Sequence, residues 1–450
     1  MNKRILTVVM SLFLVTVTID GLNAQVLPLR EQAKIIDEVI DDRLNNLLPQ
    51  LMERTGIDMW VMITREYNED PIVKTMLPAT WISARRTTML VFYYNPTTKE
   101  YTKSAVARYN VGSSIKAAWD MTKYPDQWDA LMALVNKHQP KKIGINMSKS
   151  FGHADGLDHT EYEQFMQKLP ATFKTKVVSS EPLAVAWLET RTAREMQYYP
   201  QVVQISKAII AEGFSSKVIT PGITTSEDLV WWYRQKINSL GLSTWFHPSV
   251  EIQRNDQVEF DHLKAFSNKG YDPKNIILPG DLLHVDFGIT YLRLNSDIQE
   301  HAYVLKPTEK DAPDYLKNAL TIGNRLQDIL TNQFALNKTG NNILADALAQ
   351  AKKENINATI YTHPIGAHGH AAGPTIGMWD QQNGVPGSGD YPMYYNTAYS
   401  IELNAAVEIK EWKKTIRIML EQDGFFDQTG FRYISGRQTK LHLVGNPNWQ

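Results

Sequence analysis

The chain has 450 residues, of which 43% are hydrophobic and 21% charged, a composition that is typical of globular proteins and argues against a disordered or fibrous chain. Its formal net charge of −1 leaves no basic excess with which to hold a nucleic acid. The absence of cysteine excludes disulfide scaffolds, thiolate metal sites and cysteine nucleophiles.

The N-terminal segment has the organisation of a secretory signal. Lys3 and Arg4 precede an apolar run over residues 5–18, and Ala24 is a small residue at a possible cleavage site. The run is shorter than the roughly 20 residues that span a bilayer. We therefore expect a signal peptide over 1–24 and a periplasmic or secreted mature protein without membrane attachment. An uncleaved membrane anchor is the alternative.

The first half of the mature chain alternates helical and strand-like segments. Apolar residues recur at helical spacing over 29–55. Short apolar runs bounded by turn residues predict strands over 58–63, 88–94, 100–108 and 142–146. A further helix is predicted over 128–138. Strands that alternate with helices predict an α/β domain over residues 26–180.

A second domain is predicted over 182–440. The sequence Thr192-Ala193-Arg194-Glu195 fits a capping box, and a helix is predicted from there to Lys217, with Pro200 bending it or delaying its start. A second capping sequence begins at Thr225. Beyond it, strand-like segments and helices mix, which predicts an α+β domain. The strand-like segments are 282–289, 359–365, 398–407 and 415–420, and the helices are 313–332 and 343–354.

Two aspartates lie eleven residues apart in this second domain. A turn at Pro279-Gly280-Asp281 predicts a strand over 282–288 that carries Asp286 near its end, and Asp297 follows. If a tight hairpin joins the two segments, both carboxylates face one side of neighbouring strands and repel each other unless a cation or a shared proton lies between them. Taken alone, each aspartate is more simply interpreted as a solvated turn or strand-end residue.

Two glutamates lie at or near the ends of apolar strand-like runs. Glu402 follows the run that begins at Ala398, and Glu421 follows the run over 415–420. A charge in such a place is costly unless it is paired or ligated. A sheet-edge charge, or a buried pair with Arg417, is the alternative for either glutamate.

Three of the 11 histidines lie within eight positions, at His363, His368 and His370, among glycines and prolines. On a strand, His368 and His370 would share a face, and the glycines would let the backbone approach a ligand. Carboxylates with one or two imidazoles and no sulfur suit Mn²⁺, Co²⁺, Fe²⁺ or Zn²⁺. Four carboxylates can bridge two metal ions about 3.5–4 Å apart.

The order Asp, Asp, His, Glu, Glu across one domain resembles the creatinase/prolidase/aminopeptidase P superfamily, the pita-bread metallopeptidases. Residues 280–288 (GDLLHVDFG) are close to that family's first-ligand motif, and the eleven-residue step to Ser296-Asp297 matches its second. Residues 52–58 (MERTGID) resemble the creatinase N-terminal domain. The resemblance implies an α/β creatinase-like N-terminal domain followed by an α+β pita-bread catalytic domain.

The resemblance also implies a dinuclear metal centre, most often of Mn²⁺ in relatives. The implied ligands are Asp286, Asp297, Glu402, Glu421 and either His368 or His370. Counting forward from His363 favours His368, whereas counting back from Gly373 favours His370. Glu402 is the implied proton shuttle. His363 and His262 are the candidates for an imidazole that faces the substrate, with a surface residue as the alternative for His262.

The sequence departs from the family pattern at several motifs. Glu402-Leu403-Asn404 stands where the family writes Glu-Pro-Gly, and Ile298-Gln299-Glu300 replaces a Thr-Arg-Thr-like phrase. Glu421 follows Arg417 by four residues instead of two. A second catalytic histidine, expected seven residues after the ligand, would fall on Thr375 or Gly377 and is therefore missing at that spacing.

The function implied is that of a metal-dependent exopeptidase acting on Xaa-Pro bonds, of aminopeptidase P or prolidase type. Its substrate would be a peptide with proline at the second position, and relatives commonly form homodimers. A metal-free creatinase-like hydrolase, or an inactive member that binds peptides or partners, is the alternative that the altered motifs favour. A nucleic-acid partner is not expected, because no stripe of Lys and Arg interleaved with aromatic residues occurs.

Overall fold

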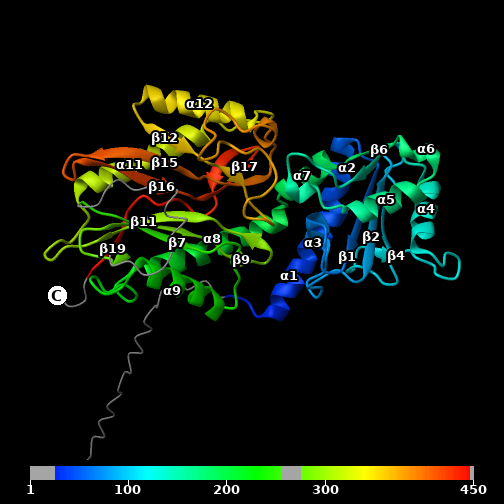
Figure 1. Cartoon of the computed structure of the whole chain (residues 1–450), viewed down its shortest axis with the longest axis horizontal. Coiled ribbons are helices and arrows are strands. Elements are labelled where there is room, and N and C mark those ends of the chain that lie inside the picture. The colour runs from blue at the N-terminus through cyan, green and yellow to red at the C-terminus, as the bar shows by residue number, and fades with distance from the viewer. Residues whose placement is uncertain (1–25, 256–274, 446–450) are drawn as a thin grey trace, which may run out of the picture.

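The computed structural model describes residues 26–255 and 275–445, which form two lobes (Figure 1). The predicted signal peptide, residues 1–24, and His262 lie outside the described residues. Within the two described ranges, no helix has the length and apolar character needed to cross a membrane.

The first lobe is built on a six-stranded mixed sheet in the order β4-β3-β2-β1-β5-β6. Its strands are β1 (Met59–Arg65), β2 (Thr87–Tyr94), β3 (Tyr101–Val106), β4 (Lys116–Ala117), β5 (Ile143–Ile145) and β6 (Val177–Ser179). Its helices are α1 (Leu29–Asp42), η1 (Arg43–Leu47), α2 (Leu48–Thr55), α3 (Pro71–Met76), α4 (Gln127–His138), η2 (Gly152–Ala154), α5 (His159–Lys168), α6 (Ala171–Lys174) and α7 (Glu181–Glu189). The predicted α/β class is confirmed.

The central strands of this lobe are apolar on both faces because helices cover both sides of the sheet. Alternate residues of a strand point to opposite faces. On β1, Trp60 and Met62 pack into the cluster formed with α1, α2 and α7, whereas Met59 and Val61 pack into the cluster formed with α4 and α5. The apolar run over 59–63, the main part of the strand predicted over 58–63, is therefore buried on both faces.

The second lobe contains several smaller sheets, ordered β19-β11-β8-β7, β12-β15-β16, β13-β14-β17-β18 and β10-β9. Its strands are β7 (Ser249–Gln253), β8 (Leu282–Phe287), β9 (Thr290–Tyr291), β10 (Leu294–Asn295), β11 (Ile298–Val304), β12 (Asn357–Ile360), β13 (His363–Pro364), β14 (Thr397–Ser400), β15 (Leu403–Ile409), β16 (Lys414–Leu420), β17 (Asp423–Asp427), β18 (Gly430–Tyr433) and β19 (His442–Val444). Its helices are α8 (Ala193–Gly213), α9 (Ser226–Ser239), α11 (Asp314–Thr331), α12 (Gly340–Lys353) and η4 (Ser388–Asp390).

Helices enclose these sheets from two sides. α8 and α9 pack against the sheet that contains β8 and β11, while α11 packs on β15 and β16 and α12 packs on β12 (Figure 1). This is the predicted pita-bread arrangement. The predicted domain limits, 26–180 and 182–440, stay predictions.

Both predicted helix caps are present. Thr192 with Glu195, and Thr225 with Asp228, form capping boxes that start α8 and α9. Because the cap starts α8 at Ala193, Pro200 lies inside the helix and does not delay its start. The helix ends at Gly213, earlier than the predicted end.

Candidate metal centre

Three chain segments of the second lobe are strands interrupted in the middle. Each segment contributes one strand to the sheet β12-β15-β16 and one to the sheet β13-β14-β17-β18. Along the chain, β12 is followed by β13, β14 by β15, and β16 by β17. Glu402 and Glu421 lie in two of the interruptions, and His363 directly follows the third. The residues that flank the two glutamates pair with each other, so Glu402 and Glu421 come side by side. The single strands predicted over 359–365 and 398–407 are thus wrong in this detail, because each segment passes from one sheet to another.

The two aspartates arrive from the neighbouring sheet. β8 pairs antiparallel with β11, and the short hairpin β9–β10 lies between them, which meets the condition under which both aspartates face one side of neighbouring strands. Asp286 lies opposite Gln299, which also pairs with Glu421. As a result, oxygens of Asp286, Asp297 and Glu421 lie within 4.8 Å of one another.

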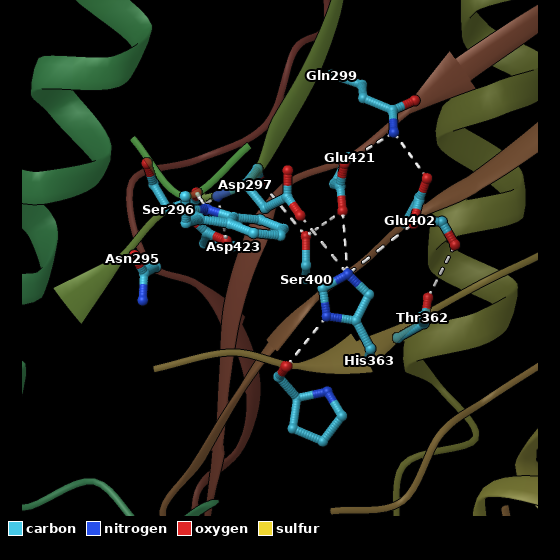
Figure 2. Close-up of polar contacts among 12 residues, drawn as sticks. Asn295, Ser296, Asp297, Gln299, Thr362, His363, Ser400, Glu402, Glu421 and Asp423 are labelled. Atoms are coloured by element: carbon cyan, nitrogen blue, oxygen red, sulfur yellow. Dashed lines mark hydrogen bonds and ion pairs between the residues drawn. The ribbon is translucent and has the colours of Figure 1, made fainter. Parts of the chain in front are cut away.

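His363 lies among the carboxylates (Figure 2). Its Nε2 atom is 3.5 Å from Glu421 Oε1, 3.6 Å from Asp297 Oδ2 and 3.9 Å from Glu402 Oε2. All four side chains are buried. The five residues Asp286, Asp297, His363, Glu402 and Glu421, called the carboxylate cluster below, therefore meet at one place inside the second lobe.

The hydrogen bonding of His363 fixes which nitrogen faces the cluster. Its Nδ1 lies 3.0 Å from the carbonyl oxygen of Pro364. A carbonyl only accepts, so Nδ1 carries a proton and donates it. In the neutral ring, Nε2 then presents a lone pair to the carboxylate oxygens. A lone pair and several carboxylates that face each other call for a cation between them.

Burial acts against charge in this cluster. It is the main cause that raises the pKa of Asp286, Asp297 and Glu402 well above the usual range, and the carboxylate of Glu421 raises all three further. Each of these groups is thus held in a place where its charged form is disfavoured unless a positive charge compensates it.

The cluster also contains polar atoms that lack the usual partners. Within residues 26–255 and 275–445, Asp286 Oδ1, Asp297 Oδ1 and His363 Nε2 are buried without a hydrogen-bond partner. Buried polar groups are rarely left so, and here they converge. Hard oxygens with one imidazole are the donor set of Mn²⁺, Co²⁺, Fe²⁺ or Zn²⁺. The residues present therefore fit divalent metal ions.

His370 lies beside the cluster, with its ring centroid 4.6 Å from that of His363. One of its nitrogens joins Asp297 and His363 in a further group within 4.8 Å. Burial first, and then the imidazole of His363, lower the pKa of His370 to about 4. Although the residue retains solvent exposure, the ring is therefore neutral at neutral pH. His370 comes seven residues after His363. With His363 in the cluster, His370 therefore stands at the spacing where a second histidine was missing when His368 or His370 was taken as the ligand.

His368 lies apart from the cluster, contrary to the prediction that it is a ligand candidate equal to His370. Its ring centroid is 4.3 Å from that of His153, and it lines a cavity of about 280 Å³ between the lobes. Residues 366–370 bend and form no strand, so the alternation that would place His368 and His370 on one face does not apply. His262 lies outside the described residues and is not placed.

Polar neighbours that the sequence did not suggest support the cluster. Ser400 Oγ donates to Glu421 Oε1 at 2.7 Å, and the backbone N–H of Asp297 lies 3.3 Å from both carboxylate oxygens of Asp423 (Figure 2). Gln299 bridges Glu402 and Glu421. The one hint in the sequence was that Gln299 falls where the family phrase after the second aspartate is altered.

A two-lobed chain with a pita-bread second lobe and buried carboxylates around a histidine defines a class of metallopeptidases. Residues 197–421, half of the chain, match the model of metallopeptidase family M24. The chain belongs to this family, whose members generally bind divalent metals.

Solved structures share the fold over most of the chain. The X-Pro aminopeptidase from Thermotoga maritima has a TM-score of 0.60 at 16% identity, covering 87% of this chain and 99% of that one. The Xaa-Pro dipeptidase from Bacillus anthracis has a TM-score of 0.56 at 17% identity, covering 92% and 100%. The prolidase from Pyrococcus furiosus has a TM-score of 0.51 at 13% identity, covering 87% and 99%. Among curated proteins, none matches this sequence.

Proposed function

We propose that this metallopeptidase is an exopeptidase that hydrolyses Xaa-Pro bonds, of aminopeptidase P or prolidase type, with two divalent ions held by the carboxylate cluster. The observation that carries the proposal is a pair of ligand groups with a common member. Asp286, Asp297 and Glu421 form one group, and His363, Glu402 and Glu421 form the other. Two adjacent groups that share Glu421 would hold two neighbouring divalent ions.

The protein's own residues would then orient the peptide and move protons. Bound divalent ions supply Lewis-acid activation of water and of the scissile carbonyl. Glu402 is the proposed proton shuttle, because its carboxylate lies at the centre of the cluster, with Oε2 3.9 Å from His363 Nε2. His370, neutral and beside His363, can donate a hydrogen bond to the peptide through one nitrogen and accept one at the other.

Aromatic side chains beside His370 support a substrate with an apolar ring. The centroid of His370 lies 5.0 Å from Trp245 and 5.7 Å from Tyr361, which in turn lies 5.9 Å from Trp379. A proline ring packs well on such faces, and its nitrogen in a peptide bond has no hydrogen that needs a partner.

The deciding experiment compares peptides of matched length with and without proline. The chain reconstituted with Mn²⁺ should release the N-terminal residue from Xaa-Pro-Xaa or split Xaa-Pro, and leave Xaa-Ala unchanged. Asp286→Ala should abolish turnover of every substrate. Equal turnover by wild type and Asp286→Ala, or no preference for proline, contradicts the proposal. The relative rates on Xaa-Pro and Xaa-Pro-Xaa assign dipeptidase or aminopeptidase type.

The remaining expectations are part of the same proposal. We propose Mn²⁺ as the native metal, a homodimer as the assembly, and a periplasmic or secreted location after cleavage behind Ala24. Elemental analysis of the native protein, its mass in solution, and N-terminal sequencing of the exported chain test these three points separately.

A further inference from the structure

Gln299 joins the two glutamates of the carboxylate cluster. It lies on β11 and is 4% exposed. Its Nε2 donates to Glu402 Oε1 at 2.7 Å and to Glu421 Oε2 at 2.8 Å (Figure 2). An amide nitrogen has two hydrogens, so both are used on these two carboxylates.

The remaining oxygen of each carboxylate faces the centre of the cluster. Glu402 Oε2 and Glu421 Oε1 are the atoms that approach His363 Nε2. Gln299 therefore holds one oxygen of each glutamate and leaves the other oxygen directed at the position where a cation would bind. A donor shared by two carboxylates also sets the distance between them.

Contacts on the side of Gln299 that faces away from the glutamates fix the orientation of its amide. Because carboxylates accept, the nitrogen faces them, and Oε1 of Gln299 faces His284 Nε2 at 3.0 Å. His284 Nε2 must then carry a proton and donate it. Nδ1 of His284 makes a close contact with Glu251 Oε2, and Ser249 Oγ donates to Glu251 Oε1 at 2.9 Å. His284 and Glu251 are both buried, so this chain of contacts is shielded from water.

We propose that Gln299 is a positioning residue that sets the spacing and orientation of Glu402 and Glu421 for cation binding, with His284 and Glu251 holding its amide in place. The inference rests on the metal centre proposed above. It also gives a role to the altered phrase Ile298-Gln299-Glu300, because the glutamine side chain is long enough to reach both glutamates.

The test measures binding of Mn²⁺ alone to the metal-free full chain, with Gln299→Met against Gln253→Met. Methionine keeps the volume of glutamine and removes its hydrogen bonds. Gln253 is a matched control: it is 1% exposed and makes two 2.8 Å hydrogen bonds, but to the backbone of Arg417 and not to the cluster. We expect Gln299→Met to weaken Mn²⁺ binding roughly 10- to 100-fold, as the loss of an outer-shell partner does. Gln253→Met should leave the affinity unchanged.

The melting temperature of each metal-free variant separates positioning from folding. Gln299→Met loses three buried hydrogen bonds and Gln253→Met loses two, so both should melt lower than wild type, while only Gln299→Met loses metal affinity. Equal affinity in Gln299→Met and wild type, or an equal loss in Gln253→Met, overturns the positioning role. If Gln299→Met does not fold, Gln299→Asn decides, because its amide is one methylene too short for both carboxylates. Unchanged affinity in that variant also overturns the role.

The same titration distinguishes the two proposals. A wild-type chain that binds no Mn²⁺ overturns the metal centre, and the positioning role with it. A wild-type chain that binds Mn²⁺ no better than Gln299→Met overturns only the role of Gln299.

Discussion

Two buried aspartates, one in each lobe, have opposite surroundings. Asp70 precedes α3 and accepts hydrogen bonds from the N–H groups of Ile72 and Val73 and from the side chain of Asn146. Asp297, in contrast, has a buried oxygen without a partner in the described part of the chain and faces other carboxylates. The first lobe uses a buried acid to cap a helix, whereas the second assembles acids that call for a cation. The following predictions test this contrast.

The largest effect is expected from Asp297→Asn. The activity proposed above should fall at least about 1,000-fold, which corresponds to about 4 kcal/mol of transition-state stabilisation. The metal-free variant should nevertheless melt higher than metal-free wild type, because a neutral amide replaces a carboxylate that its neighbours repel. Peptidase assays and thermal melts check the two halves.

Asp70→Asn serves as the control for that variant, since it removes a carboxylate that already has donors. At neutral pH it should raise the melting temperature less than Asp297→Asn does, because hydrogen-bond donors already offset part of the cost of burying the Asp70 carboxylate. A rise of the same size in both variants would contradict the contrast between the lobes.

The core of the first lobe should tolerate a cavity poorly. Trp60 is fully buried on β1, and its indole N–H donates to Asn146 Oδ1 at 2.8 Å. Trp60→Ala should lower the free energy of unfolding by about 3–5 kcal/mol. Mn²⁺ affinity, measured well below the melting temperature, should be unchanged because Trp60 lies in the other lobe. A parallel loss of affinity would show that the lobes do not act separately.

The pH dependence of stability should contain a contribution from Asp70. Burial is the main cause that raises its pKa to about 6 from the ordinary value of 3.8. The folded chain therefore binds a proton more tightly than the unfolded chain between these values. The stabilisation is complete below about pH 4 and is lost as the pH rises through 6, by up to about 3 kcal/mol. Denaturant titrations from pH 4 to 7 should give a shallower fall for Asp70→Asn, and identical slopes would contradict the assignment.

The smallest effect is expected from metal removal. A ligand that binds only the folded chain stabilises it by about 2.7 kcal/mol at a concentration 100 times its Kd. Chelation should lower the melting temperature of wild type accordingly and leave that of Asp297→Asn nearly unchanged. Calorimetry with and without chelator measures both melting temperatures. An unchanged melting temperature of wild type on chelation would contradict a cation bound in the cluster.

Local patterns in the sequence predicted much of the architecture. The run at 58–63 is a buried strand, the capping boxes at Thr192 and Thr225 start helices, and the eleven-residue step from Asp286 to Asp297 spans a hairpin. Each of these features depends on residues close in the chain, so short-range periodicity and spacing are sufficient to reveal it.

Only the tertiary structure decided which histidine joins the acids and which residue bridges the glutamates. His363 and not His368 enters the cluster because the segments that carry Glu402, Glu421 and His363 are all interrupted at the place where they pass from one sheet to the other. Gln299 reaches both glutamates because its backbone on β11 pairs with that of Glu421. These are pairings between distant segments, whose register is set by the packing of the whole lobe. The amino-acid sequence by itself determined the kind of side chains available to the site, and the fold determined which of them meet.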